Sequence, residues 1–103
     1  LYSIYNHKGS KKECNLYIAG FEWNDWNIEH IAKHSVTPQE TEEACYNQPI
    51  SRRTKDGLYI VYGQTDAGRY LLMVVRYKPE SIVYVITARP MTKNEQRYYR
   101  QRR

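Results

Sequence analysis

The C-terminal half of the chain alternates short apolar runs with residues typical of turns. Runs rich in β-branched and aromatic residues predict strands at Ile50–Thr54, Leu58–Thr65, Arg69–Tyr77 and Ile82–Thr87. The Asp56-Gly57 pair between the first two runs is a strong hairpin signal. Every residue of Leu71–Val75 is apolar, which predicts a strand that is covered on both faces. Because tight turns join these runs, we expect an antiparallel sheet.

The N-terminal half predicts one further strand, followed by a helix. The strand is expected at Leu16–Trp23, with a bend or bulge at Gly20. Asn24 or Asp25 can cap the helix that follows. Helical spacing separates a buried stripe from a second face; the stripe is Ile28, Ile31 and Ala32, and the second face contains Asn27, His30 and His34.

A second helix is predicted at Val36–Asn47. Thr37 is its expected N-cap, Pro38 takes the first helical position, and Glu40 completes a capping box. Its apolar face is thin, consisting of Ala44 and Cys45, so we expect a surface helix with Cys45 turned inward.

The end of the chain combines a strand, a basic residue and a third helix. Arg89 is expected just past the last strand, where Pro90 keeps it extended. Thr92 and Glu95 have the spacing of a capping box at the start of a helix. On that helix, Tyr98 and Tyr99 are expected as partly buried anchors.

These elements follow the order β-α-α-β-β-β-β-α, which predicts an α+β domain with a small antiparallel sheet. Two helices lie on the N-terminal side of the sequence and one at the C-terminal end. The domain is expected to span 16–103. Residues 1–15 show no sustained period and are interpreted as an extension, or alternatively as a short hairpin at the sheet edge.

The net positive charge is concentrated at the C-terminal end. The formal charge of the chain is +5, and the segment from Arg89 onward also sums to +5. Its positive residues are Arg89, Lys93, Arg97, Arg100, Arg102 and Arg103, against Glu95 as the negative one. A cationic helix of this kind favours an anionic partner such as nucleic acid. The 11 tyrosines add rings that can stack on bases.

The cysteines and the hydropathy pattern indicate the compartment. Cys14 and Cys45 match no zinc or redox spacing and are interpreted as reduced thiols of a cytoplasmic protein. No apolar run has the length of a membrane span, so no membrane association is expected.

A histidine pair offers the one metal-like spacing. His30 and His34 are placed like zinc ligands on a helix, but Ile31 stands where a metalloprotease has glutamate, and no third ligand is evident. We therefore predict no metal and no cofactor. Lys33-His34 can hold a phosphate and transfer a proton, or can simply be a solvated helix face.

Arginines within apolar strands need a partner. Arg69 and Arg76 are costly to bury unless they pair or reach an open face. If that face is a cleft near Arg89, it forms an anion site.

Taken together, these residues resemble the BrnT toxins of the RelE superfamily of type II toxin–antitoxin systems. The matching residues are Phe21–Trp23, Asn27, Lys33-His34, Gly63, Thr87-Ala88-Arg89, Thr92, Glu95 and Tyr98. The chain departs from the family pattern at Ser35, where glycine is usual, and at Tyr84 and Pro90, where arginine is frequent.

The resemblance implies a metal-independent ribonuclease that is held inactive by a cognate, BrnA-like antitoxin. Arg89, with Arg76 second, would stabilise the phosphate and the transition state, since arginine is a poor base but a good bidentate clamp. His34 is the first candidate for proton transfer and Tyr98 the alternative. Further substrate contacts are expected from Lys33, Trp23, Arg97 and Arg100, although Trp23 is equally well explained as a core residue.

Other interpretations keep the basic helix without catalysis. The protein can be a module that grips nucleic acid through phosphates alone, or a degenerate toxin that only binds its antitoxin. Glu95 is most simply a capping residue in either case.

Overall fold

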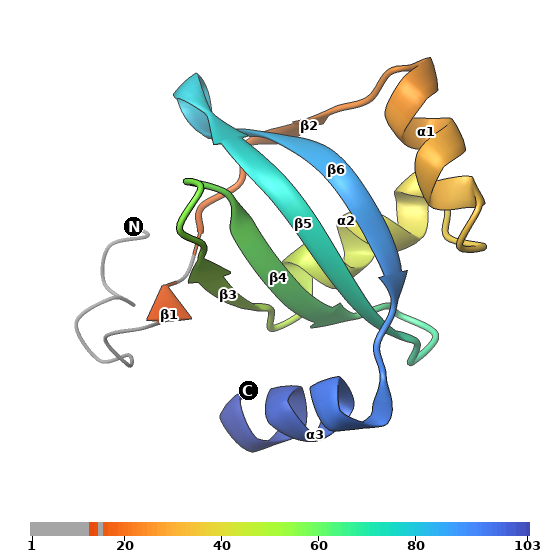
Figure 1. The fold of residues 1–103 in the computed structure, drawn as a ribbon, viewed down its shortest axis with the longest axis vertical. Helices are drawn as coiled ribbons and strands as arrows, with labels where there is room; N and C mark the ends of the chain where they lie inside the picture. The colour runs from red at the N-terminus through yellow and green to blue at the C-terminus, as the bar shows by residue number, and fades with distance from the viewer. Residues whose placement is uncertain (1–12, 15) are drawn as a thin grey trace.

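The computed structural model describes residues 13–14 and 16–103, and these form a six-stranded sheet with helices packed against it (Figure 1). The spatial order of the strands is β1-β3-β4-β5-β6-β2. The elements are β1 (Glu13–Cys14), β2 (Gly20–Glu22), α1 (Asp25–Ala32), α2 (Pro38–Tyr46), β3 (Ile50–Arg53), β4 (Tyr59–Gln64), β5 (Tyr70–Lys78), β6 (Ile82–Pro90) and α3 (Lys93–Arg102), with a 3₁₀ turn at Pro79–Ser81. The predicted α+β class is confirmed.

Strands β3 to β6 form the expected antiparallel meander, but β2 pairs with β6 in parallel. The expectation of a wholly antiparallel sheet was therefore wrong at this edge. The predicted strand Leu16–Trp23 was also too long, because only Gly20–Glu22 aligns with a partner strand. In the sequence, α1, α2 and strands β3 to β5 lie between β2 and β6. No tight turn therefore constrains the direction of β2 relative to β6.

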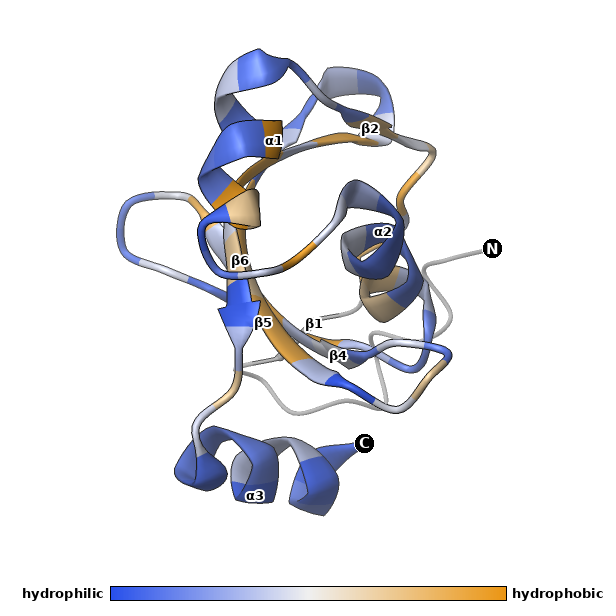
Figure 2. Ribbon diagram, turned by 90° about the vertical axis from the view of Figure 1, so that its right-hand side faces the viewer, coloured by the Kyte–Doolittle hydropathy of each residue, from blue (hydrophilic) through white to orange (hydrophobic). Residues whose placement is uncertain are grey.

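The sheet is covered on both faces. Leu71, Met73 and Val75 point toward a core that includes Ile31 of α1 and Ala44 of α2. On the opposite face, the alternating residue Leu72 packs with Tyr99 of α3 and other buried residues. This confirms the prediction for Leu71–Val75. Figure 2 shows that α3 is largely hydrophilic and lies apart from α1 and α2. None of the helices in the described residues is both long and apolar enough to cross a membrane.

Helix α1 buries a different stripe from the predicted one. Ile31 is fully buried, but Ile28 is 37% exposed and Ala32 is exposed. Asn27, placed on another face by its spacing, is fully buried instead. Its side-chain amide donates to the Glu22 and Val85 carbonyls at 3.1 and 3.0 Å, and its carbonyl oxygen accepts from the backbone N–H of Asn24. These hydrogen bonds join β2, α1 and β6, and they set the orientation of the helix in place of an apolar stripe.

Helix α2 lies directly on the sheet at a glycine. A side chain at Gly63 would place its Cβ 1.9 Å from the Ala44 carbonyl oxygen, so only glycine permits this approach. Thr37 and Glu40 form the predicted capping box. Cys45 is buried as predicted, and burial raises the pKa of its thiol to about 12. This thiol is therefore a packing group.

The segment 1–15 was interpreted as an extension or an edge hairpin. Within it, Glu13–Cys14 forms β1, an edge strand that pairs with β3. The remainder of that interpretation lies outside the described residues, as does the Cys14 side chain.

Candidate functional site

The face of the sheet against which α3 packs, here called the α3 face, gathers much of the predicted chemistry. Strand register places Ile50, Tyr62, Leu72 and Arg89 side by side across β3 to β6. Arg89 thus lies inside β6 and pairs with Leu72; the expectation that it stands past the strand end was wrong. Since β5 extends far enough to pair with Pro90, the strand ends at this proline, three residues later than predicted.

Arg89 makes a bidentate ion pair with Glu95 of α3. Its Nη1 and Nη2 atoms donate to Glu95 Oε1 and Oε2, both at 2.8 Å. The hydrogen bond with Glu95, opposed by desolvation and helped by coulombic attraction, raises the pKa of Arg89. The same hydrogen bond from Arg89 is the largest cause that lowers the pKa of Glu95. The pair fixes the junction between β6 and α3.

Glu95 also stabilises the first turn of α3. Its Oε1 accepts from the Thr92 backbone N–H at 2.9 Å, and Thr92 Oγ1 accepts from the Glu95 N–H at 3.2 Å. The predicted capping box is confirmed. Glu95 therefore combines the capping role with a contact to Arg89 that requires the tertiary structure.

Tyr98 lies one helical turn after Glu95, within a cluster of tyrosines and arginines. Its ring centroid is 4.9 Å from that of Tyr62. The guanidinium carbons of Arg52 and Arg102 lie 5.7 and 3.9 Å from the Tyr98 centroid. Arg52 also donates to the Tyr62 hydroxyl at 3.3 Å. Such contacts hold cations against ring faces without a carboxylate.

Sequence reasoning did not single out Arg52 or Tyr62. The sequence did contain a signal for Arg52, because it stands two residues after Ile50 in a predicted strand, and residues two apart share one face of a sheet. Only the register between β3 and β4 shows that this face is the one facing α3.

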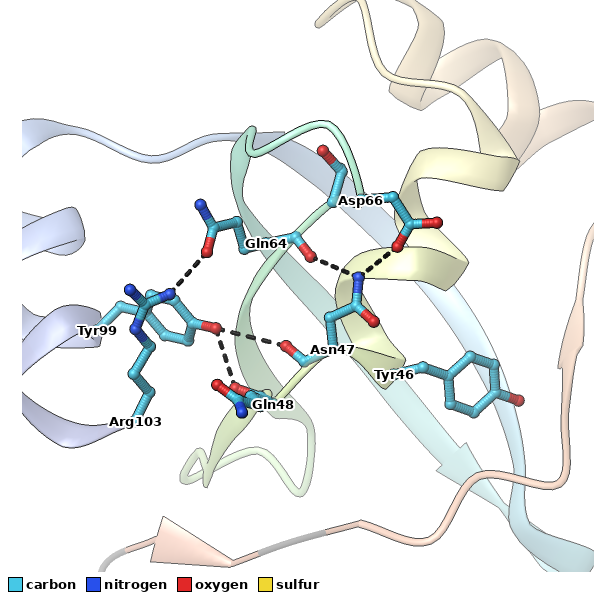
Figure 3. Close-up of a pocket in the computed structure, with 8 residues that line it drawn as sticks. Tyr46, Asn47, Gln48, Gln64, Asp66, Tyr99 and Arg103 are labelled. Carbon is cyan, nitrogen blue, oxygen red and sulfur yellow. Dashed lines mark hydrogen bonds between the residues drawn. The ribbon is translucent and has the colours of Figure 1, made fainter.

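The remaining α3 residues anchor the helix or extend outward. Tyr99 is fully buried and donates to the Gln48 carbonyl at 3.0 Å, as expected for an anchor (Figure 3). Arg100 lies over the Tyr70 ring at 5.8 Å. Arg97 is exposed and donates to Asn94 within the same helix. Arg100 is therefore on the α3 face with Arg89 and Tyr98, whereas the contact of Arg97 is local.

Lys33 and His34 lie at the C-terminal end of α1, and both are exposed. The His34 ring contacts His30, whose ring stacks on Trp26. The contacts of His34 are thus with α1, and the structure does not bring it to Arg89. Ser35, which follows, has a φ of 62°, a conformation that glycine adopts most easily.

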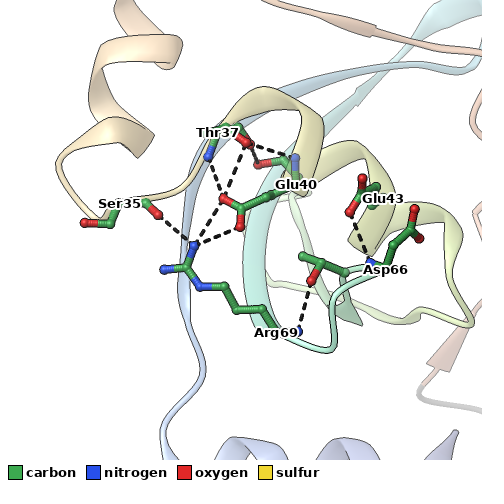
Figure 4. A network of polar contacts seen from close by, with 8 residues as sticks. Ser35, Thr37, Glu40, Glu43, Asp66 and Arg69 are labelled. Atoms are coloured by element: carbon green, nitrogen blue, oxygen red, sulfur yellow. Dashed lines mark hydrogen bonds and ion pairs between the residues drawn. The ribbon is translucent and has the colours of Figure 1, made fainter.

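Arg69 has a structural partner. Its Nη1 donates to the Ser35 carbonyl at 2.7 Å and to both Glu40 carboxylate oxygens at 3.1 Å (Figure 4). Desolvation alone would raise the pKa of Glu40, but hydrogen bonds from Thr37 and Arg69 outweigh it and lower the pKa. Of the predicted alternatives for Arg69, pairing is the one observed, and it ties β5 to the α1–α2 loop.

Arg76 lies near the other end of β5. It is exposed and stands opposite Tyr84, whereas Leu72, four residues earlier, stands opposite Arg89. At about 3.3 Å per residue, this separation along the strand is roughly 13 Å. Arg76 and Arg89 therefore do not form one phosphate clamp in this arrangement.

Trp23 belongs to the opposite face of the sheet. It is partly buried against the core beneath α2, and its indole Nε1 donates to Glu42 at 2.8 Å. This matches the core interpretation of Trp23. The α3 face therefore combines Arg89, Tyr98 and Arg100, and leaves Trp23, Lys33 and His34 elsewhere.

In the described residues, no cluster of three or more histidine, cysteine, aspartate or glutamate side chains could hold a metal ion. A polar pocket of about 480 Å³ lies beside α3, lined by Tyr99, Arg103 and residues of the α2–β3 and β4–β5 connections (Figure 3). Several of its groups are hydrogen-bonded to one another, such as Asn47 to Asp66 at 2.7 Å and Arg103 to Gln64 at 2.6 Å.

Comparison with known protein families and with curated proteins finds no match for this chain. The likeness to the BrnT toxins therefore rests on the residues named above.

Proposed function

We propose that this protein is a metal-independent endoribonuclease toxin that acts in the cytoplasm and is inhibited by a cognate antitoxin. The observation that supports it best is the α3 face, where a bidentate-capable arginine, Arg89, lies near phenols of Tyr62 and Tyr98. The resemblance to the BrnT toxins suggests RNA cleavage as the reaction, and the α3 face contains an arginine and tyrosine hydroxyls suited to it.

The reaction needs a cation for the phosphorane and groups that move protons. The 2′-hydroxyl of the RNA gives its proton to a water molecule and attacks the adjacent phosphorus; the bond to the 5′-oxygen breaks, which leaves a 2′,3′-cyclic phosphate and a 5′-hydroxyl. Arg89 can stabilise the charge that develops on the phosphoryl oxygens, once it exchanges Glu95 for phosphate. The Tyr98 hydroxyl is the proton donor to the leaving oxygen, since Tyr98 lies on the α3 face with Arg89, whereas the ring contact of His34 is with His30 of α1.

Cleavage of RNA by the purified protein in EDTA tests this proposal. Arg89→Ala should abolish cleavage, and Tyr98→Phe should reduce it by about a hundredfold while keeping the ring contacts. Lys55→Ala, an exposed cation in a turn, is the control and should cleave normally. Loss of activity in EDTA, or full activity of both site variants, would overturn the proposal.

A second candidate is a non-catalytic module that binds nucleic acid or only the antitoxin. It is favoured by the Arg89–Glu95 pair, because both donor atoms of the guanidinium fork are engaged. Salt-dependent RNA binding with no new RNA ends, in the tube and after induction in growing bacteria, would support this candidate over the toxin.

A further inference from the structure

Two kinds of contact, with carboxylates and with tyrosine rings, hold several arginines of the described residues. Carboxylates pair with Arg69 and Arg89, at 3.1 and 2.8 Å, and so offset their charge. Arg52, Arg100 and Arg103 instead lie over tyrosine rings, and the ion pairs seen in the described residues involve Arg69, Lys78 and Arg89 rather than these three. A ring orients a guanidinium but leaves its net charge available to an anion.

The ring-held arginines gather around α3. Arg52 contacts Tyr98 and Tyr62, Arg100 contacts Tyr70, and Arg103 contacts Tyr99. Arg103 also donates to the Gln64 side-chain oxygen at 2.6 Å (Figure 3). The supporting rings of Tyr62 and Tyr70 come from strands of the sheet. The ring contacts thus restrict where these cations lie, which lowers the entropic cost of binding an anion.

We propose that Arg52, Arg100 and Arg103 form a phosphate-binding track for single-stranded RNA, and that this track docks the strand independently of Arg89. The proposal rests on the proposed function for the choice of RNA. Arg89 engages the scissile phosphate only after docking, because its fork is already on Glu95. Docking and cleavage are therefore carried out by different arginines.

The tyrosine–arginine stacks favour a single strand over a duplex. Unpaired bases can stack on aromatic rings and on guanidinium planes, whereas duplex RNA hides its base faces. Arg102 illustrates such a plane, with its guanidinium carbon 3.9 Å from the Tyr98 centroid.

The test is binding of a 2′-O-methyl RNA oligonucleotide of mixed sequence, which cannot be cleaved, measured by fluorescence anisotropy at several salt concentrations. Each of Arg52→Ala, Arg100→Ala and Arg103→Ala should weaken binding severalfold and reduce the log–log salt slope by about 0.7, the value for one phosphate contact. Arg89→Lys should bind within about twofold of the parent. Arg52→Lys should restore the slope, since the charge is kept.

Arg53→Ala is the matched control. Arg53 adjoins Arg52 and also lies over a ring, that of Tyr59, but Tyr59 packs on the opposite face of the sheet. Binding by this variant should be unchanged. Thermal unfolding of each variant, expected within a few degrees of the parent, verifies folding.

The outcomes separate this inference from the proposed function. If the parent cleaves RNA but substitution of the three arginines leaves RNA binding unchanged, the track is wrong and the proposed nuclease stands. Binding that depends on the three arginines, without any cleavage, would uphold the track and overturn the nuclease. Equal loss in Arg53→Ala, or equally tight arginine-dependent binding of duplex RNA, would also count against the track.

Discussion

Arg89 contacts Glu95 through both its positive charge and the two N–H donors of its guanidinium, and a lysine substitution distinguishes these two contributions. In Arg89→Lys, the fold should persist with a loss of about 1 kcal/mol, because the pair is partly exposed and such pairs contribute little. RNA cleavage should fall by roughly a hundredfold or more, since lysine keeps the charge but loses the fork. Unfolding in urea and cleavage rates measure the two effects. A lysine variant that cleaves within a few fold of the parent would exclude Arg89 as the clamp.

Glu95 should make stability depend on acid. The hydrogen bond from Arg89 lowers its pKa below the usual 4.5, so the folded state favours the charged carboxylate. The stabilisation is fully present above about pH 4.5 and is lost as the pH falls through the lowered value. Glu95→Gln should therefore be less stable than the parent at pH 7 and lose less stability on acidification to pH 3. Melting temperatures measured across this range give the comparison; parallel curves for the two proteins would contradict it.

At the scale of elements, the close approach of α2 to β4 depends on the absence of a side chain at Gly63. Gly63→Ala should destabilise the protein by about 3 kcal/mol, because the added methyl group meets the Ala44 backbone oxygen. Gly20→Ala is the control, since its nearest contact is the Ile82 side chain at 3.4 Å, and it should cost little. Chemical denaturation measures both. Equal stability of the two variants would show that α2 can move away at no cost.

Signals within a few consecutive residues predicted where helices and strands occur better than they predicted which residues are buried and how the strands pair. The capping boxes at Thr37 and Thr92 were predicted correctly because each is encoded within four consecutive residues. The burial of Asn27 was not, since one of the two carbonyls that its side chain contacts belongs to Val85, 58 residues away in the sequence. The direction of β2 was missed for the same reason.

The candidate site followed the same rule. Arg89, Glu95 and Tyr98 were identified from one continuous stretch. Arg52 and Tyr62 became visible only through strand register. The expectation for His34 remains a prediction, because the structure places it on α1 and tests no activity.

At the scale of the whole molecule, the concentration of charge predicts how a partner binds. A cognate antitoxin should cover Arg89 and α3 with an acidic segment, and association should slow steeply as salt increases. Protection of α3 amides from hydrogen exchange in the complex, together with association rates at several salt concentrations, measures this. A complex that leaves Arg89 and α3 open would contradict the masking, although not the pairing of the proteins.

The parallel pairing of β2 with β6 has a consequence for how the protein acquires its structure. Gly20 lies beside Ile82, so this ladder closes a loop of about sixty residues. Contacts of such sequence separation form slowly, which predicts a folding rate governed by chain topology. During synthesis, β6, which contains Arg89, has to emerge from the ribosome before β2 can pair with it. A nascent chain interrupted before β6 would thus lack both the β2–β6 ladder and Arg89.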